Sequence, residues 1–184
     1  MSLTLDNQLD LLFPANLIPA DVKSKLPSDL HIRPLALTDY HRGHLDVLSV
    51  LTDAPDPGLH AYTAQFNRLR ASSGFRSTYT LVILNSDSDK VVAVGTVFIE
   101  AKFTRNLGLV GHIEDIAVDK SQQGKKLGLR VIEALTSISE NAGCYKTILN
   151  CSEANVAFYD KCGYSRKGAE MAKYTPQRSH SPRL

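Results

Sequence analysis

A strand-like stretch over Val110–Asp119 (VGHIEDIAVD) is followed, after a break at Ser121–Gly124, by a helical repeat over Lys125–Asn141. The first stretch is rich in β-branched residues, whereas the second has an apolar period close to 3.6. That period places four apolar residues on one helical face: Leu127, Val131, Leu135 and Ile138. This succession limits the chain to folds in which helices pack on a sheet.

The rest of the chain repeats this alternation. We expect an extended N-terminal arm with Pro14, Pro19 and Pro27, which has room for a helical turn, and we expect Thr38 as a helix N-cap. Before the strand and helix described above, we expect a strand at Leu30–Pro34, helices at Asp39–Leu51 and His60–Ser72, and a hairpin of Thr78–Leu84 with Lys90–Glu100. After them we expect a strand at Tyr145–Cys151, a helix at Glu153–Lys161 and a final strand at Tyr164–Tyr174. The order describes one α/β or α+β sheet domain.

The 184 residues suffice for one domain with a real core. We expect an N-terminal arm at residues 1–29, a single domain at residues 30–174 and a flexible, polar tail at residues 175–184.

Composition narrows the class of protein. The 43% share of hydrophobic residues can fill a core, and no stretch approaches the roughly 18 uninterrupted apolar residues of a membrane helix. No basic residue precedes Lys23, which argues against a secretory or transit peptide. Three cysteines, an odd number, lie in apolar or periodic segments and favour reduced thiols. We therefore expect a cytoplasmic protein with no membrane partner.

The formal net charge of +2 conceals a gradient along the chain. Residues 1–30 carry four acids and two bases, whereas residues 161–184 carry six bases and one acid. The basic end has neither interleaved aromatics nor a recognisable nucleic-acid-binding module, so we expect no nucleic-acid partner.

The segment Asp119–Gly128 (DKSQQGKKLG) has the properties of a phosphate-binding loop. Gly124 lets the backbone turn, and Gly128 permits close approach in the first helical turn. Free amides at a helix N-terminus carry partial positive charge, and four cations surround them here: Lys120, Lys125, Lys126 and Arg130. A solvated basic helix start remains an alternative interpretation. The spacing matches neither a Walker nucleotide loop nor a Rossmann dinucleotide loop.

A second block, Asn155–Tyr164 (NVAFYDKCGY), follows an expected strand. With the loop, it resembles the GCN5-related N-acetyltransferase (GNAT) superfamily, in which a Q/R-x-x-G-x-G/A loop binds the pyrophosphate of coenzyme A. Here the loop reads Gln123–Gly128 (QGKKLG), so Lys126 stands where that pattern has its usual fourth-position glycine.

The block Gly111–Val118 (GHIEDIAV) narrows the resemblance to the glucosamine-6-phosphate N-acetyltransferases, with support from Gly143–Lys146 (GCYK). The resemblance extends from about Leu30 to Tyr174 and implies an α/β (α+β) GNAT fold, with a mixed, mostly antiparallel sheet flanked by helices. It implies direct acetyl transfer from acetyl-CoA to the 2-amino group of D-glucosamine 6-phosphate, in UDP-N-acetylglucosamine biosynthesis. It also implies a homodimer with substrate sites near the subunit interface.

The resemblance gives catalytic roles to four residues. Tyr159 is the implied acid, because a phenol can hydrogen-bond the departing thiolate and protonate it. Asn150 stands where family members can carry a carboxylate, and its amide can bond the sugar amine but cannot act as a base. The base is then a backbone carbonyl, water, Glu114 or Asp115. Neighbouring residues alternate faces on a strand, so both acids reach one cleft only if the strand bulges.

Matching positions imply further contacts. Backbone groups of Ile116, Ala117 and Val118 would bind the pantetheine arm by strand addition, and an amide there could stabilise the oxyanion. The other implied coenzyme A contacts are Gln123, Gly124, Lys125, Lys126, Leu127, Gly128, Leu129, Asn155, Tyr159 and Lys161. The implied amino-sugar and phosphate contacts are Thr52, Lys102, Arg105, Glu114, Asp115, Tyr145, Lys146, Asn150 and Tyr174.

Other clusters carry less weight. His41 and His44 have the spacing of half a metal site, but no second cluster completes it, so we interpret them as part of a solvated helix face and expect no metal. The cysteines lack C-x-x-C spacing and are best explained by packing. Two alternatives stay open: a GNAT enzyme for a protein or another small amine, and a coenzyme A-binding module without chemistry.

Overall fold

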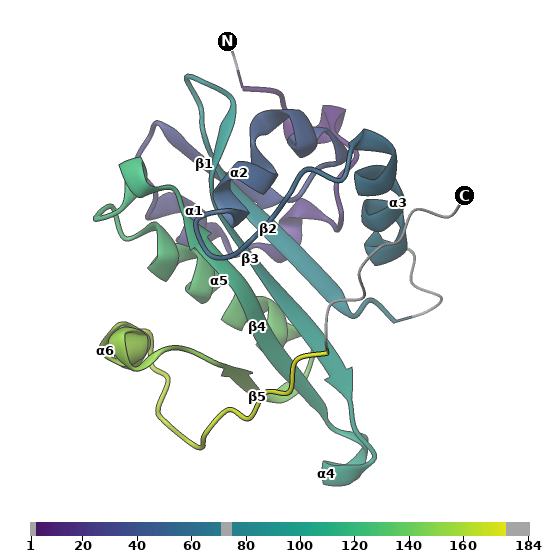
Figure 1. Cartoon of the computed structure of the whole chain (residues 1–184), viewed down its shortest axis with the longest axis vertical. Helices are drawn as coiled ribbons and strands as arrows, with labels where there is room; N and C mark the ends of the chain where they lie inside the picture. Colours follow the sequence, from purple (N-terminus) through teal and green to yellow (C-terminus); the bar gives the residue numbers. More distant parts are fainter. Residues whose placement is uncertain (1–2, 71–74, 176–184) are drawn as a thin grey trace. The chain divides into compact units, whose positions relative to one another are not determined.

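The computed structural model describes residues 3–70 and 75–175, and the chain divides into two compact units, Met1–Leu149 and Asn150–Leu184. The first unit holds a five-stranded sheet in the order β1-β2-β3-β4-β5 (Figure 1). Its strands are β1 (Leu30–Pro34), β2 (Thr78–Asn85), β3 (Lys90–Ala101), β4 (Leu109–Val118) and β5 (Cys144–Leu149). All neighbours are antiparallel except β4 and β5, which are parallel. The expected mixed, mostly antiparallel α/β architecture is confirmed.

Helix α5 (Leu127–Asn141) connects the two parallel strands, as a parallel pair requires. It packs along one face of the sheet, and α2 (His44–Leu48) lies on the other face (Figure 1). The four apolar residues of the expected helical repeat are all buried. Gly95 of β3 lies beneath α5, where an added Cβ would come within 2.4 Å of Val131. The sheet therefore needs a glycine at this position to let the helix approach.

The single helix expected over Asp39–Leu51 is wrong. The structure has a 3₁₀ turn, η3 (Leu37–Arg42), and then α2, with Gly43 between them at a φ of +84°. Glycine adopts this left-handed conformation at little cost, so the chain bends there. The expected N-cap at Thr38 is also wrong. Turn η3 begins at Leu37 with Ala36 as its N-cap, and the Asp39 carboxylate accepts the N–H of Ala36 at 2.7 Å.

The strand expected over Tyr164–Tyr174 is wrong as well. The described part of the second unit contains η5 (Glu153–Asn155) and α6 (Val156–Lys161), followed by chain without regular structure. Residues 165–175 are exposed throughout. A strand needs a neighbour that bonds its backbone groups, and β-prone residues alone do not supply one.

The other expected elements appear with shifted ends. The β2–β3 hairpin is confirmed, α5 begins at Leu127 instead of Lys125, and β5 ends at Leu149 instead of Cys151. Helix α3 (Leu59–Arg70) matches the expected second helix, whose last residues, 71–72, lie outside the described residues. The boundaries 30–174 of a single domain stay a prediction.

The N-terminal arm forms three short helical turns, η1 (Asp6–Gln8), η2 (Ala15–Leu17) and α1 (Ala20–Ser24). It places apolar side chains in the core of the first unit: Leu12, Phe13, Ile18 and Val22. The arm is thus part of the packed unit.

No helix in the described ranges reaches the length and apolar content that a membrane span requires.

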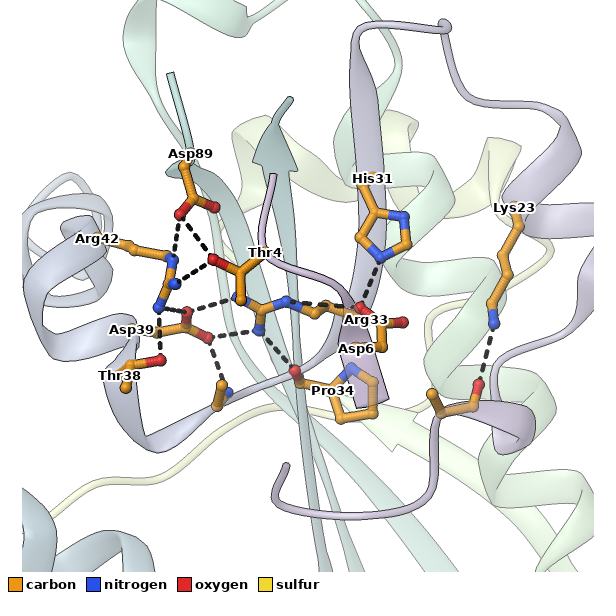
Figure 2. A network of polar contacts seen from close by, with 12 residues as sticks. Thr4, Asp6, Lys23, His31, Arg33, Pro34, Thr38, Asp39, Arg42 and Asp89 are labelled. Atoms are coloured by element: carbon orange, nitrogen blue, oxygen red, sulfur yellow. Dashed lines mark hydrogen bonds and ion pairs between the residues drawn. The ribbon is translucent and has the colours of Figure 1, made fainter. Parts of the chain in front are cut away.

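Figure 2 shows a polar network in the first unit, centred on Arg33 of β1 and Asp39 of η3. Both residues are fully buried, and their bidentate hydrogen bonds measure 2.7 and 2.6 Å. Arg42 lies 3.5 Å from the same carboxylate and bonds Asp89 at 2.9 Å, before β3. On the arm, Asp6 bonds His31 at 2.8 Å and lies 3.9 Å from the Arg33 guanidinium. One buried ion pair thus connects the arm, β1 and η3.

We predict that Asp39→Ala lowers the free energy of unfolding by about 3–5 kcal/mol, because it leaves the buried Arg33 charge without its partner. Urea unfolding followed by circular dichroism measures the change. The matched control is Asp46→Ala, which removes an exposed carboxylate from α2 and should cost at most about 0.5 kcal/mol. Equal losses in the two variants would contradict the assigned role of the pair.

Candidate active site

Strand β4 is distorted at Asp115, whose backbone has a φ of +57°. The register with β3 places Asp115 and Ile116 opposite the single residue Gly95. Two residues opposite one define a β-bulge, which turns side chains away from strict alternation. Glu114 and Asp115 are accordingly both exposed. Strand β4 therefore has the bulge that the two predicted acids need in order to reach one cleft.

Beyond this bulge, β4 continues without β5. The ladder between the two strands ends at Ile113 and Leu149, so that β5 does not pair with the segment Asp115–Val118. This is the stretch whose backbone is predicted to bind the pantetheine arm. An extended ligand could add to a strand edge of this kind through main-chain hydrogen bonds.

The predicted phosphate loop lies between β4 and α5. Its first turn, η4 (Lys120–Gln122), is fixed by the Asp119 carboxylate, which accepts the N–H of Ser121 at 2.8 Å. These hydrogen bonds from Ser121 lower the pKa of Asp119. Gly124 has a φ of +85°, and no atom of the described residues other than its chain neighbours lies within 4 Å of the position of an added Cβ, so backbone conformation, not space, requires the glycine. The loop then enters α5, whose first amides and helix dipole can bind an anion.

Lys126, which stands at the usual glycine of the motif, has a φ of +61° and is the N-cap of α5. A residue with a Cβ pays roughly 1–2 kcal/mol for this left-handed conformation. The structure thus explains why glycine suits the position and shows that the loop keeps the same backbone turn with lysine.

The four predicted loop cations differ in their contacts. Lys125 Nζ lies 2.8 Å from the Gln122 amide oxygen, and Arg130 pairs with Glu133. Lys120 and Lys126 are exposed. Of the other predicted contacts, Gln123 is exposed, Leu127 is buried in the core, and Gly128 and Leu129 are half-buried in the first turn of α5.

Two of the predicted phosphate cations meet at the exposed ring of Tyr145. The guanidinium carbon of Arg105, in α4 (Thr104–Leu107), lies 5.7 Å from the ring centroid, and Lys146 Nζ lies 5.8 Å from it. Lys102 instead pairs with the Glu100 carboxylate. Thr52 lies in the connection between α2 and α3 and is exposed.

Sequence reasoning missed Glu100 and His112 at this end of the sheet. The Glu100 carboxylate bonds Lys102 and, at 3.0 Å, His112 Nε2, and these two bonds lower its pKa. His112 pairs with Phe98 across β3 and β4 and lies within the Gly111–Val118 block. The sequence signal that could have identified His112 was its position between Gly111 and Ile113, as a titratable residue next to apolar ones.

His44 contradicts the sequence interpretation of a solvated helix face, since its side chain is only 7% exposed. The bend at Gly43 turns α2 so that His44 faces α3, where its Nδ1 shares a hydrogen bond of 3.0 Å with the Tyr62 hydroxyl. His41 is exposed, as expected. Among the described residues, no group of three His, Cys, Asp or Glu side chains is arranged to hold a metal.

The remaining predicted residues belong to the second unit. Tyr159, on α6, is half-buried, packs edge-on against Phe158 at 4.9 Å and accepts the N–H of Tyr164 at its carbonyl. Asn155 is the N-cap of α6, and Lys161 is its last residue. Asn150 and Tyr174 are exposed. The catalytic and binding roles of all these residues stay predictions.

Known proteins resemble the chain over most of its length. The model of the acetyltransferase (GNAT) family matches residues 39–164. A glucosamine 6-phosphate N-acetyltransferase of Dictyostelium discoideum is 42% identical over 156 residues, which cover 84% of this chain and 97% of that protein. A Candida albicans enzyme of the same name is 43% identical, covering 79% and 96%. The crystal structure of the Arabidopsis thaliana enzyme superposes with a TM-score of 0.76 at 40% identity, covering 79% and 97%.

We predict that Lys126→Gly raises the free energy of unfolding by up to about 1 kcal/mol, because relief of the left-handed strain exceeds the entropy cost of glycine. The control is Lys125→Gly, at a neighbouring position without positive φ, which should cost about 0.5–1 kcal/mol. Thermal unfolding measures both. If the two variants lose the same stability, backbone strain at Lys126 is not the reason that the motif favours glycine.

Proposed function

Because the chain belongs to the acetyltransferase (GNAT) family, together with the glucosamine 6-phosphate N-acetyltransferases, we propose that it acetylates D-glucosamine 6-phosphate. The acetyl group of acetyl-CoA is transferred to the 2-amino group, giving N-acetylglucosamine 6-phosphate and coenzyme A. The observation that carries this proposal is the 42% identity across 97% of the Dictyostelium enzyme. A match of this extent includes the segments proposed here to bind the substrate and the coenzyme.

The residues of the first unit fit acetyl-CoA. The helix N-terminus of α5, Gly124 and the exposed Lys120 and Lys126 suit a pyrophosphate. The β4 edge at Asp115–Val118 suits an extended amide-containing arm. Both lie on one continuous segment from the bulge to the helix. Acetyl-CoA, when bound there, supplies the activated acyl group.

The proposed reaction is a direct displacement within the ternary complex. The neutral sugar amine attacks the acetyl carbon, the carbon–sulfur bond breaks, and the amine loses one proton while the sulfur gains one. Glu114, Asp115 or a water held by them takes the proton from the amine, since both acids are exposed at the bulge. Tyr159 donates to the sulfur, and this acid need only assist, because a thiolate is a good leaving group.

The phosphate of the sugar needs cations, and Arg105, Lys146 and Lys102 are the proposed ones. The first two already lie against one aromatic ring, Tyr145. Lys102 is held by Glu100, so a phosphate would compete with that carboxylate for it. This cationic end of the sheet favours a sugar phosphate over a neutral amine and over a cationic protein substrate.

We further propose a homodimer. Apolar side chains are exposed on β3, β5 and the turn between β3 and β4, where Phe103 is 97% and Leu107 68% exposed. Phe98, Tyr145 and Ile148 extend this apolar surface. Exposed apolar patches of this kind favour association. Sedimentation equilibrium should give twice the 20.2 kDa mass of the chain, and a single-chain mass at micromolar concentration would contradict the proposal.

A cytoplasmic location and a role in UDP-N-acetylglucosamine biosynthesis complete the proposal. The free thiols of Cys144, Cys151 and Cys162 support a reducing compartment. The product, an N-acetylated amino-sugar phosphate, already carries the N-acetyl group that UDP-N-acetylglucosamine contains.

We predict thiol release with acetyl-CoA and glucosamine 6-phosphate, and at least about tenfold lower kcat/KM with glucosamine, because the neutral sugar forfeits the charged hydrogen bonds of the phosphate. A thiol-reactive dye follows the reaction. Equal kcat/KM for the two sugars would contradict phosphate recognition. Release with neither sugar but with a peptide amine would favour the protein-acetylating alternative.

We predict that Tyr159→Phe lowers kcat by about 10²-fold, the usual range for loss of a general acid, while coenzyme A binding changes less than about twofold. Steady-state kinetics and calorimetry measure the two quantities. Tyr164→Phe is the control, since it removes a neighbouring hydroxyl whose ring lies 6.5 Å from Tyr159. An unchanged kcat would reduce Tyr159 to a packing role.

A further inference from the structure

A chain of four side chains links the segments around the connection between α2 and α3. His44 of α2 and Tyr62 of α3 are 7% and 8% exposed, and His44 Nδ1 lies 3.0 Å from the Tyr62 hydroxyl. The Tyr62 ring lies 5.2 Å from the ring of Tyr40 in η3. The Tyr40 hydroxyl donates to the Asp56 carboxylate at 2.9 Å. The chain runs from the buried interior to the exposed connection.

Asp56 in turn fixes the end of the connection. Its Oδ1 accepts the N–H of Gly58 at 2.8 Å, directly before α3. Residues 53–57 form neither helix nor strand, and two of them, Pro55 and Pro57, have no N–H to donate. Side-chain contacts at Asp56 must therefore supply much of the order of this segment.

The charge states suit a permanent connection. Burial lowers the pKa of His44 to about 4, so that the ring is neutral near pH 7. Protonation would make both ring nitrogens N–H donors, and Nε2 is a buried atom for which the described residues offer no hydrogen-bond partner. The bond to Asp56 raises the pKa of Tyr40, which keeps its hydroxyl protonated as the donor. The buried histidine of the four-residue network is therefore uncharged near pH 7, and the charged carboxylate of Asp56 lies at its exposed end.

The connection leaves α2, the helix that packs against the strand of the proposed acceptor acids. Helix α2 packs against β3 and β4, and β4 carries the bulge with Glu114 and Asp115. The segment Ser49–Gly58 leaves α2 directly and includes Thr52, a predicted contact of the amino sugar. Its placement relative to these two strands depends on how η3, α2 and α3 are held together.

We propose that His44, Tyr62, Tyr40 and Asp56 form a positioning chain that fixes Ser49–Gly58 as a wall of the amino-sugar site. This inference rests on the proposed function. The four residues act through the segment and do not touch the reacting atoms. Acceptor binding therefore depends on them, whereas acetyl-CoA binding at the α5 loop does not.

The test uses Tyr40→Phe, which removes one hydroxyl from a half-buried side chain and keeps the ring on Tyr62. We expect KM for glucosamine 6-phosphate to rise roughly three- to tenfold, with kcat and KM for acetyl-CoA within about twofold. The matched control is Tyr79→Phe, which removes a hydroxyl from β2, outside the four-residue positioning chain, and should change none of these constants. A merely structural role would alter thermal stability without separating the two KM values.

Asp56 provides the rescue. Asp56→Asn keeps an acceptor oxygen for Tyr40 and should retain KM within about twofold, whereas Asp56→Ala, which also removes the acceptor of the Gly58 N–H, should raise KM at least as much as Tyr40→Phe. The double variant Tyr40→Phe/Asp56→Ala should be no worse than Asp56→Ala alone, because both changes remove the same Tyr40–Asp56 bond. Additive losses, or an equal rise of both KM values, would overturn the inference.

A second measurement needs no activity. Hydrogen–deuterium exchange of the amides in residues 49–58 should be faster in Tyr40→Phe than in the wild type and the Tyr79→Phe control. Unchanged exchange overturns the positioning chain even if the enzyme acetylates the sugar phosphate. If exchange is faster in Tyr40→Phe but the wild-type protein releases no thiol with this sugar, the proposed function is contradicted and, with it, the acceptor-site role of the segment.

Discussion

The buried ion pair of Arg33 and Asp39 is the constraint around which the first unit is arranged. Two charges without solvent require mutual contact and further hydrogen bonds, and here the carboxylate also accepts the N–H of Ala36. The carboxylate can do so only if the chain turns sharply after β1. That turn, with Gly43 behind it, sets the start of α2 and the burial of His44.

The residues proposed for the chemistry lie where regular structure is interrupted. The bulge at Asp115 exposes two adjacent acids, the end of the β5 ladder opens an edge of β4, and the left-handed Lys126 turns the loop into α5. Each interruption costs backbone energy or hydrogen bonds. The packed face of the sheet, with Gly95 against α5, holds these interruptions in place.

Charge is distributed at the proposed sugar site so that no cation is wholly unsupported. Lys102 and His112 share Glu100, while Arg105 and Lys146 lie against the Tyr145 ring. Cations stacked on an exposed ring remain available to a phosphate, because the aromatic contact does not occupy their N–H groups. Arg105 and Lys146 therefore contact an aromatic ring at this site, whereas Lys102 is held by the Glu100 carboxylate.

Much of the fold and of the candidate site could be predicted because the relevant signals are local. The apolar period of α5, the β-branched strands and the block Gly111–Val118 are readable residue by residue, and they led to the family. The sequence could not determine that His44 is buried, that Glu100 joins Lys102 to His112, or that Tyr164–Tyr174 forms no strand within its unit. These outcomes depend on which distant segments meet, such as η3 with α3 or β3 with β4. The sequence alone therefore determined the elements and the class of chemistry, because propensity and motif are properties of neighbouring residues. The tertiary structure decided the bulge, the positioning chain and the charge partners, because burial and pairing exist only once separate segments pack together.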